Sequence, residues 1–122
     1  MADRLDPTLR ITMLPRDTNA HGTIFGGIIL SHIDLAGGIA ASKQASRNFV
    51  TRAMREVEFI APVYVGDVVS FYAAVLRRGT TSITIKVSVK AERGKEPRRR
   101  VKVTEAEVVY VAVDETGKPA PL

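Results

Sequence analysis

The residues best suited to chemistry in this sequence lie between positions 17 and 38. Asp34 is a lone carboxylate inside an apolar run, and such surroundings favour a carboxylate that acts as a base. Gly26 and Gly27 precede that run, where glycines let a ligand oxygen reach the unpaired N–H groups that begin a helix. Asn19 is a neutral amide that can orient water or donate a hydrogen bond to a carbonyl.

Each of these residues also has an ordinary structural interpretation. A Gly-Gly pair can be a tight turn into a helix, Asn19 can be a turn residue, and Asp34 can pair with an arginine or face solvent. His21, beside Gly22, is either a general base or a solvated turn residue. His32 stands on a different helical face from Asp34, and we expect it to pack or to lie in an interface.

The spacing of Gly26 and Asp34 argues against a site made by one chain. Eight residues of helix separate them by about 12 Å along the axis, too far to act on one carbonyl. If two such helices pack antiparallel about a two-fold axis, the helix start of one chain faces Asp34 of the other. A stripe of small residues beside Asp34 leaves room for a neighbouring helix or an acyl chain: Gly27, Ser31, Gly37, Gly38 and Ala41.

The surrounding sequence predicts the elements that position these residues. Apolar residues recur at three- and four-residue steps from Ile24 to Gln44, which predicts a helix of five turns or more, buried on most sides. Segments rich in Val, Ile, Thr and Tyr predict strands. We expect them at 9–14, 49–60, 68–78, 81–92 and 99–114, with a bulge near Glu105 to Glu107.

One long apolar helix and about five antiparallel strands predict an α+β fold, with a curved sheet wrapped around the helix in a single domain over residues 1–122. The connections are short enough for antiparallel neighbours. Such a chain leaves an edge strand and one side of the helix open. Dimerisation through the edge strand would cover both.

The composition excludes several classes of protein. The 122 residues are 45% hydrophobic and 25% charged, as in globular chains. Without Cys there is no disulfide, thiolate zinc site or Cys nucleophile, and with two His we expect no metal and no cofactor. No apolar run approaches the roughly 18 residues of a membrane span, and the first residues do not resemble a signal peptide. We expect a cytoplasmic protein without a membrane partner.

The net charge of +5 is concentrated in residues 93–102, which hold six bases and one acid. A neutral body with one cationic segment suits a compact polyanion at least as well as a nucleic-acid duplex. We expect no nucleic-acid partner, because too few residues precede position 10 for a helix-turn-helix. We expect only one aromatic residue, Tyr110, near the basic segment. A single aromatic residue does not make a surface on which successive bases could stack.

Three stretches together closely resemble the hotdog-fold acyl-CoA thioesterases, in particular the bacterial YciA-like group. They are Asp17–Gly27 with the later Asp34, then Phe59–Val69, then Gly79–Ile83, within a likeness that spans nearly the whole chain. The resemblance implies a helix wrapped by an antiparallel sheet and a homodimer, assembled further as a trimer of dimers. It also implies hydrolysis of acyl-CoA at the dimer interface.

The same resemblance implies roles for single residues. Asp34 matches the catalytic carboxylate, Asn19 its partner from the other subunit, and Gly26 and Gly27 the amides that polarise the thioester carbonyl. His21 stands where relatives often have Asn, which leaves its role open. Coenzyme A is then part of the substrate. We expect contacts with it from Thr81, Ser82, Arg98, Arg99, Arg100 and Lys102, with Arg98 and Arg100 on the opposite strand face from Arg99.

Two mechanisms and two other functions remain open at this stage. Asp34 either activates a water molecule or attacks the thioester itself to form a mixed anhydride. A hotdog dehydratase or hydratase, with His21 as its base, is one alternative function. A non-catalytic acyl-CoA-binding protein is the other.

Overall fold

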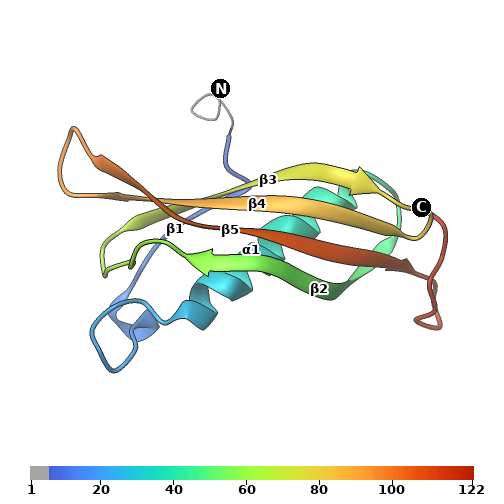
Figure 1. Cartoon of the computed structure of the whole chain (residues 1–122), viewed down its shortest axis with the longest axis horizontal. Helices are drawn as coiled ribbons and strands as arrows, with labels where there is room; N and C mark the ends of the chain where they lie inside the picture. Colours follow the sequence, from blue (N-terminus) through green and yellow to red (C-terminus); the bar gives the residue numbers. More distant parts are fainter. Residues whose placement is uncertain (1–5) are drawn as a thin grey trace.

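The computed structural model describes residues 6–122, in which one five-stranded sheet curves around one helix (Figure 1). The elements are β1 (Leu9–Thr12), a 3₁₀ turn (Pro15–Asp17), α1 (Gly26–Ser42), β2 (Asn48–Phe59), β3 (Val68–Arg78), β4 (Ser82–Arg93) and β5 (Arg99–Val113). Their order in the sheet is β1-β3-β4-β5-β2, and every neighbouring pair is antiparallel. The predicted α+β hotdog fold is confirmed.

The helix α1 begins at Gly26, as the Gly-Gly pair predicted, but its 17 residues make somewhat fewer than five turns. One side packs on the sheet through buried Ile29, Ile33 and Ala36. The other side of α1 is open, as expected for a single chain, with Leu35 and Ile39 exposed. The sheet covers only one side of α1, and no second layer formed by residues 6–122 covers the other.

The central strand β4 shows why the alternating pattern predicted a sheet. Ile83, Ile85, Val87 and Val89 are all fully buried between the sheet and α1, as expected from their two-residue spacing. The strands β1 and β2 form the two edges of the sheet. With 12 residues, β2 is the longer of these edges.

The irregularities of the sheet lie close to the predicted place but not at it. In β5 the extra residue is Val103, where the register against β4 shifts between Val89 and Lys90. Opposite the stretch from Glu105 to Glu107 the extra residue belongs to β2, where Glu56 has a left-handed φ of 58°. The predicted bulge at Glu105 to Glu107 is therefore wrong in position. Up to Val103 the odd-numbered residues of β5 face α1, and beyond it the even-numbered residues do. This change accounts for the shift in the alternating pattern of the sequence.

Candidate functional site

Asp34 lies near the middle of α1 and turns toward β2. The Thr51 hydroxyl donates a hydrogen bond of 2.6 Å to Asp34 Oδ1, and the Tyr110 hydroxyl donates one of 2.7 Å to the Asp34 backbone carbonyl. Among residues 6–122 no arginine pairs with this half-buried carboxylate, so the structure does not support the arginine-pair interpretation. One carboxylate oxygen is anchored, and Oδ2 remains available.

Tyr110 fixes the backbone of α1 beside Asp34. Its ring lies directly against Gly37, where an added Cβ would collide with the hydroxyl group. Burial, and secondarily the charge of Asp34, raise the pKa of Tyr110 well above its ordinary value, so the hydroxyl stays protonated and can donate. Gly37 thus makes room for Tyr110, and not for an acyl chain or a second helix.

The predicted stripe of small residues does not form one surface. Gly37 and Ala41 are buried against the sheet, whereas Ser31 is exposed. At Gly27 an added Cβ would meet the Phe25 ring at 2.5 Å. The members of the stripe differ in direction because successive helix residues turn by about 100°.

An open groove of about 420 Å³ contains Asp34 and runs between α1 and the start of β2. Its walls are Asp34, Leu35, Gly38, Ile39 and Ser42 of α1, Arg47 before β2, Asn48, Phe49 and Thr51 of β2, and Tyr110 of β5. Apolar side chains therefore lie next to a carboxylate, a combination suited to an acyl group with a polar reacting end.

The start of α1 offers the unpaired N–H groups that the sequence predicted. Phe25 caps the helix without a side-chain hydrogen bond, and within the described residues the N–H groups of Gly26 and Gly27 have no acceptor. At Gly26 an added Cβ would lie 3.6 Å from the Phe59 ring, an ordinary contact. The helix dipole makes this end favourable for an oxygen that gains negative charge.

Asn19 organises the loop just before this helix start. Its Oδ1 accepts hydrogen bonds from the backbone N–H of His21 (2.8 Å) and of Thr23 (3.3 Å), and its Nδ2 donates to the Thr23 hydroxyl (2.9 Å). Asn19 is thus a turn residue, as the ordinary interpretation held, with one amide hydrogen still free to donate. His21 is exposed.

His32 has a packing role. Its ring stacks on Phe71 with centroids 5.7 Å apart, and its Nδ1 lies 2.7 Å from the Ile28 carbonyl. Because a carbonyl only accepts, Nδ1 carries the proton. Of the two expected roles, packing or a place in an interface, the contacts within the chain show packing.

The chain brings Asn19 and Gly26 to one end of the molecule and keeps Asp34 apart from them. Gly26 and Asp34 belong to one continuous helix, so their separation of about 12 Å along its axis applies. A site that uses all three residues therefore needs a second copy of the chain.

The basic segment is less free than its charge suggested. Arg93 forms an ion pair of 2.9 Å with buried Asp67, Arg98 lies 3.6 Å from Glu96, Arg100 lies 3.7 Å from Glu92, and Lys102 lies 2.8 Å from Glu105. The pKa of Glu105 is lowered, chiefly by its hydrogen bond with Lys102. Most of these cations are thus partly neutralised by a neighbouring acid.

The residues expected at coenzyme A do not lie together in one chain. Thr81 precedes β4 and Ser82 begins it, whereas the basic segment begins at Arg93, the last residue of this 12-residue strand. Arg100 and Lys102 pair with Glu92 and Lys90 on the sheet face away from α1, while Arg99 pairs with Arg93 on the other face.

The expectation that Tyr110 is the aromatic residue near the basic segment is wrong. Tyr110 is buried under Gly37, far along β5 from residues 93–102. The aromatic rings that the cations meet are Tyr64, under the Arg93 guanidinium at 4.8 Å, and Tyr72, whose hydroxyl lies 3.4 Å from Arg100.

Thr51 is the site residue that sequence reasoning missed. It stands 17 positions after Asp34, within β2. Threonine is common in β-strands, so its presence there did not indicate a functional role. Only the packing of β2 beside α1 brings its hydroxyl to the carboxylate. The sequence offered no signal that could have found it.

Comparison with known proteins decides the family. The model of the Thioesterase superfamily matches residues 21–98, which include the helix and most of the sheet. The chain belongs to the thioesterase superfamily. This superfamily member is 47% identical to the acyl-CoA thioester hydrolase YciA of Salmonella typhimurium over 93% of this chain and 87% of that protein.

Solved structures of superfamily members agree in fold. A hexameric hotdog-fold thioesterase of Campylobacter jejuni is 44% identical, with a TM-score of 0.91 over 98% of this chain and 92% of that one. An acyl-CoA hydrolase from Staphylococcus aureus, solved with butyryl coenzyme A and coenzyme A, is 30% identical, with a TM-score of 0.85 over 93% of this chain and 68% of that one. In the part of this chain that the structure describes, none of the helices could span a membrane.

Proposed function

We propose that this chain hydrolyses acyl-CoA to coenzyme A and a carboxylic acid, with Asp34 as the catalytic carboxylate in a site shared by two copies. The acyl-CoA thioesterase function predicted from the sequence is confirmed by curated relatives 44–47% identical over most of the chain. The observation that carries the role of Asp34 is its carboxylate, anchored by Thr51 and without an ion-pair partner among residues 6–122, in a groove with apolar side chains beside it.

A second line of support for Asp34 comes from the Staphylococcus aureus hydrolase. It was solved as two variants, one with an aspartate and one with a threonine replaced by alanine, at positions 17 apart. Asp34 and Thr51 are also 17 apart, and here the threonine hydroxyl touches the carboxylate. We therefore assign Thr51 as a positioning residue that holds Oδ1 and leaves Oδ2 for chemistry.

In the water-activation mechanism, Asp34 Oδ2 takes a proton from water while the water oxygen bonds to the thioester carbon. The carbonyl oxygen becomes negative and is bound by the N–H groups of Gly26 or Gly27 from the other copy. The carbon–sulfur bond then breaks, coenzyme A leaves as a thiolate, and the thiolate takes up a proton. Direct attack by Asp34, with later hydrolysis of the mixed anhydride, uses the same residues.

The edge strand β2 supports the pairing of two copies. Its exposed charges change sign along the strand, with Arg52 and Arg55 before Glu56 and Glu58. In an antiparallel pair of identical strands, the basic half of each copy lies against the acidic half of the other. We propose this homodimer and a further trimer of dimers, which would have the six subunits of the hexameric relatives.

The alternative functions have less support. A hydratase base at His21 would have to act from an exposed loop whose backbone is tied to Asn19. The curated relatives are hydrolases and not binding proteins. We expect no cofactor, and we expect the enzyme to act in the cytoplasm.

The experiment that tests the proposal is release of free thiol from acyl-CoAs of graded chain length. Wild type should release thiol, and Asp34→Asn should not. Hydration of crotonyl-CoA without thiol release would instead establish the hydratase function. Binding without any turnover would establish a non-catalytic acyl-CoA-binding protein.

A further inference from the structure

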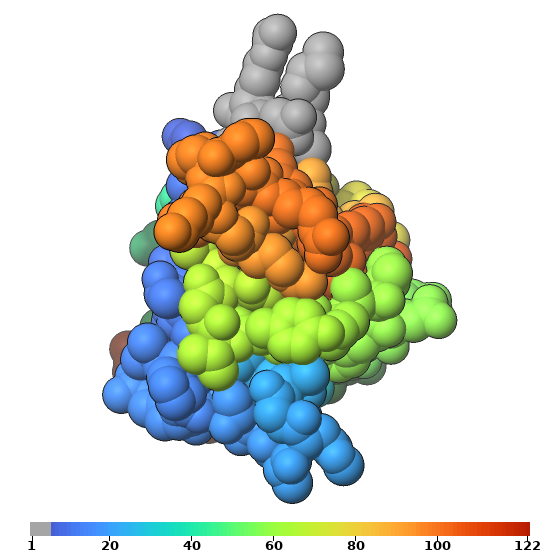
Figure 2. Space-filling model, turned by 90° about the vertical axis from the view of Figure 1, so that its left-hand side faces the viewer, coloured from blue at the N-terminus to red at the C-terminus, as the bar shows by residue number. Residues whose placement is uncertain are grey.

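The groove beside Asp34 extends in one direction only. Its helical wall begins at Asp34 and continues to Ser42, eight residues later, and includes no residue of α1 before Asp34. Eight residues of helix rise by about 12 Å. The start of α1 lies at the opposite end of the molecule, which Figure 2 shows with the segment after β2 between the β4–β5 hairpin and the loop before α1. A chain that begins at the carboxylate and follows the groove therefore runs toward the end of α1.

The chemical character of the walls changes along this direction. Leu35 and Ile39 are the large apolar residues of the helical wall, and Phe49 is that of the strand wall. Past Ile39 the helical wall ends at Ser42, and the loop between α1 and β2 contributes Arg47. The apolar part of the groove therefore ends within about 12 Å of the carboxylate, at a hydroxyl and a guanidinium.

The polar end of the groove is a boundary with a second cavity. Ser42, Arg47 and Asn48 line the groove and also line a neighbouring cavity of about 670 Å³. The other walls of that cavity come from the loop after α1 and from the end of β5: Ala45, Ser46, Val113, Asp114, Glu115 and Thr116. Because the same three residues belong to both spaces, they form the partition between them. Arg47 has the longest side chain of the three and so contributes most to this partition.

Arg47 is held at the partition by hydrogen bonds from two parts of the residue. Its Nε donates to the Pro121 carbonyl at 2.8 Å, and its backbone N–H donates to the Ala45 carbonyl at 2.9 Å. The residues on both sides of Pro121 are tied to the rest of the chain by backbone hydrogen bonds of 2.8 and 3.0 Å. The side chain of Arg47 is therefore anchored to a fixed carbonyl and keeps its place between the two cavities.

We propose that Arg47 sets the upper limit of acyl-chain length in this enzyme, because it closes the far end of the groove. The inference rests on the proposed function. An extended chain advances by about 1.2 Å per bond, so the groove holds an acyl group of roughly eight to ten carbons. Carbons within the apolar part gain from leaving water. Carbons beyond it would displace water from the guanidinium without replacing its hydrogen bonds.

The test measures kcat/KM by thiol release from butyryl-, octanoyl-, dodecanoyl- and palmitoyl-CoA, each below the concentration at which it forms micelles. In wild type, kcat/KM should rise from butyryl- to octanoyl-CoA and fall for the two longer substrates. Arg47→Ala joins the two cavities and should raise kcat/KM for dodecanoyl-CoA about tenfold, with a change of less than about twofold for butyryl-CoA. Ser42→Leu narrows the groove from the helix and should lower kcat/KM for octanoyl-CoA about tenfold, with little effect on butyryl-CoA.

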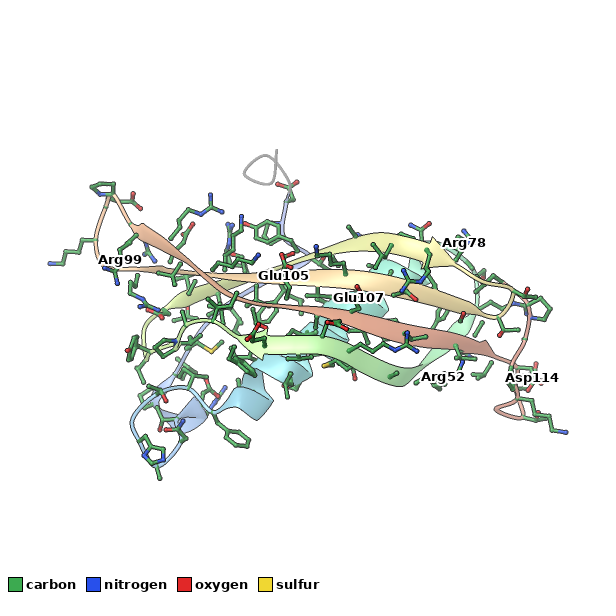
Figure 3. All side chains as sticks on the ribbon, viewed as in Figure 1. Arg52, Arg78, Arg99, Glu105, Glu107 and Asp114 are labelled. Carbon is green, nitrogen blue, oxygen red and sulfur yellow. The ribbon has the colours of Figure 1, made fainter. Side chains whose placement is uncertain are left out.

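The matched control is Arg78→Ala. Arg78 also donates to a backbone carbonyl of the loop after α1, that of Gln44 at 3.5 Å, but it lines neither cavity. Figure 3 shows Arg78 and Asp114 at the same end of the molecule, away from Arg99 in the hairpin. Arg78→Ala should therefore leave the dependence on chain length as in wild type.

Three results would overturn the proposal. The first is a wild type that hydrolyses palmitoyl-CoA as fast as octanoyl-CoA. The second is an Arg47→Ala variant that changes kcat/KM equally for all chain lengths or for none. The third is an equal shift in Arg78→Ala, which would trace the effect to the loop and not to closure of the groove. A wild type that releases no thiol from any acyl-CoA would instead refute the proposed function.

Discussion

The groove around Asp34 and the basic segment at residues 93–102 both contain charge, but they use it differently. In the groove a single carboxylate is anchored by Thr51 and has no cationic partner among the described residues. In the basic segment Arg93, Arg98 and Lys102 each lie beside an acid. A lone carboxylate in an apolar stretch of sequence therefore led to an unpaired charge in the candidate site, whereas the run of charges did not, because sheet neighbours neutralise much of such a run.

The sharpest way to test this comparison is to remove the carboxylate. Asp34→Asn should lower kcat by at least about 10³, because no other carboxylate lies in the groove to take the proton from water. The measurement is thiol release, with the oligomer checked by light scattering. Loss of the oligomer in this variant would show that Asp34 is needed for assembly.

Asn19 should give the next largest effect. Asn19→Ala should lower kcat by a factor on the order of 10², if its free amide hydrogen orients water or substrate. Because the proposed site is shared by two copies, mixing Asp34→Ala chains with Asn19→Ala chains should restore part of the activity. A mixed dimer that forms and stays inactive would contradict the shared site.

The support beneath Asp34 can be tested through stability. Gly37→Ala should lower the free energy of unfolding by about 2 kcal/mol, because the new methyl group displaces the Tyr110 ring. Chemical denaturation measures this change. Gly38→Ala is the matched control, since its Cβ would lie 3.9 Å from that ring. Equal effects of the two variants would mean that helix propensity, and not the contact with Tyr110, sets the cost.

The anchoring of the carboxylate should matter less than the carboxylate itself. Thr51→Val keeps the shape but removes the donor to Asp34 Oδ1, and kcat should fall about tenfold. Thr51→Ser keeps the hydroxyl and should recover most of the rate. If both variants match wild type, Thr51 does not position Asp34.

The smallest effect is expected in the basic segment. Lys102→Gln should lower the free energy of unfolding at pH 7 by less than about 1 kcal/mol, because solvent screens a partly exposed ion pair. Lys102 lowers the pKa of Glu105 in the folded chain, so this stabilisation exists above the ordinary glutamate pKa. It disappears as the pH falls through the lowered value. A difference between the proteins that persists in acid would point to another cause.

The amino-acid sequence by itself determined the elements and the isolation of one carboxylate. The two-residue alternation from Ile83 to Val89 specified a buried strand face, and the Gly-Gly pair marked the start of α1. These features are local, because side-chain direction within a strand and the unpaired N–H groups of a helix follow from the backbone alone.

Only the tertiary structure decided which side chains meet. Thr51 reaches Asp34 because β2 packs beside α1, and Gly37 has no side chain because the Tyr110 ring occupies that space. The extra residue at Val103 sets which face of the sheet the later residues of β5 occupy, and the register with β4 puts Arg99 and Arg100 on opposite faces. Such contacts depend on strand order and register, which join residues far apart in the chain and leave no pattern within any one segment.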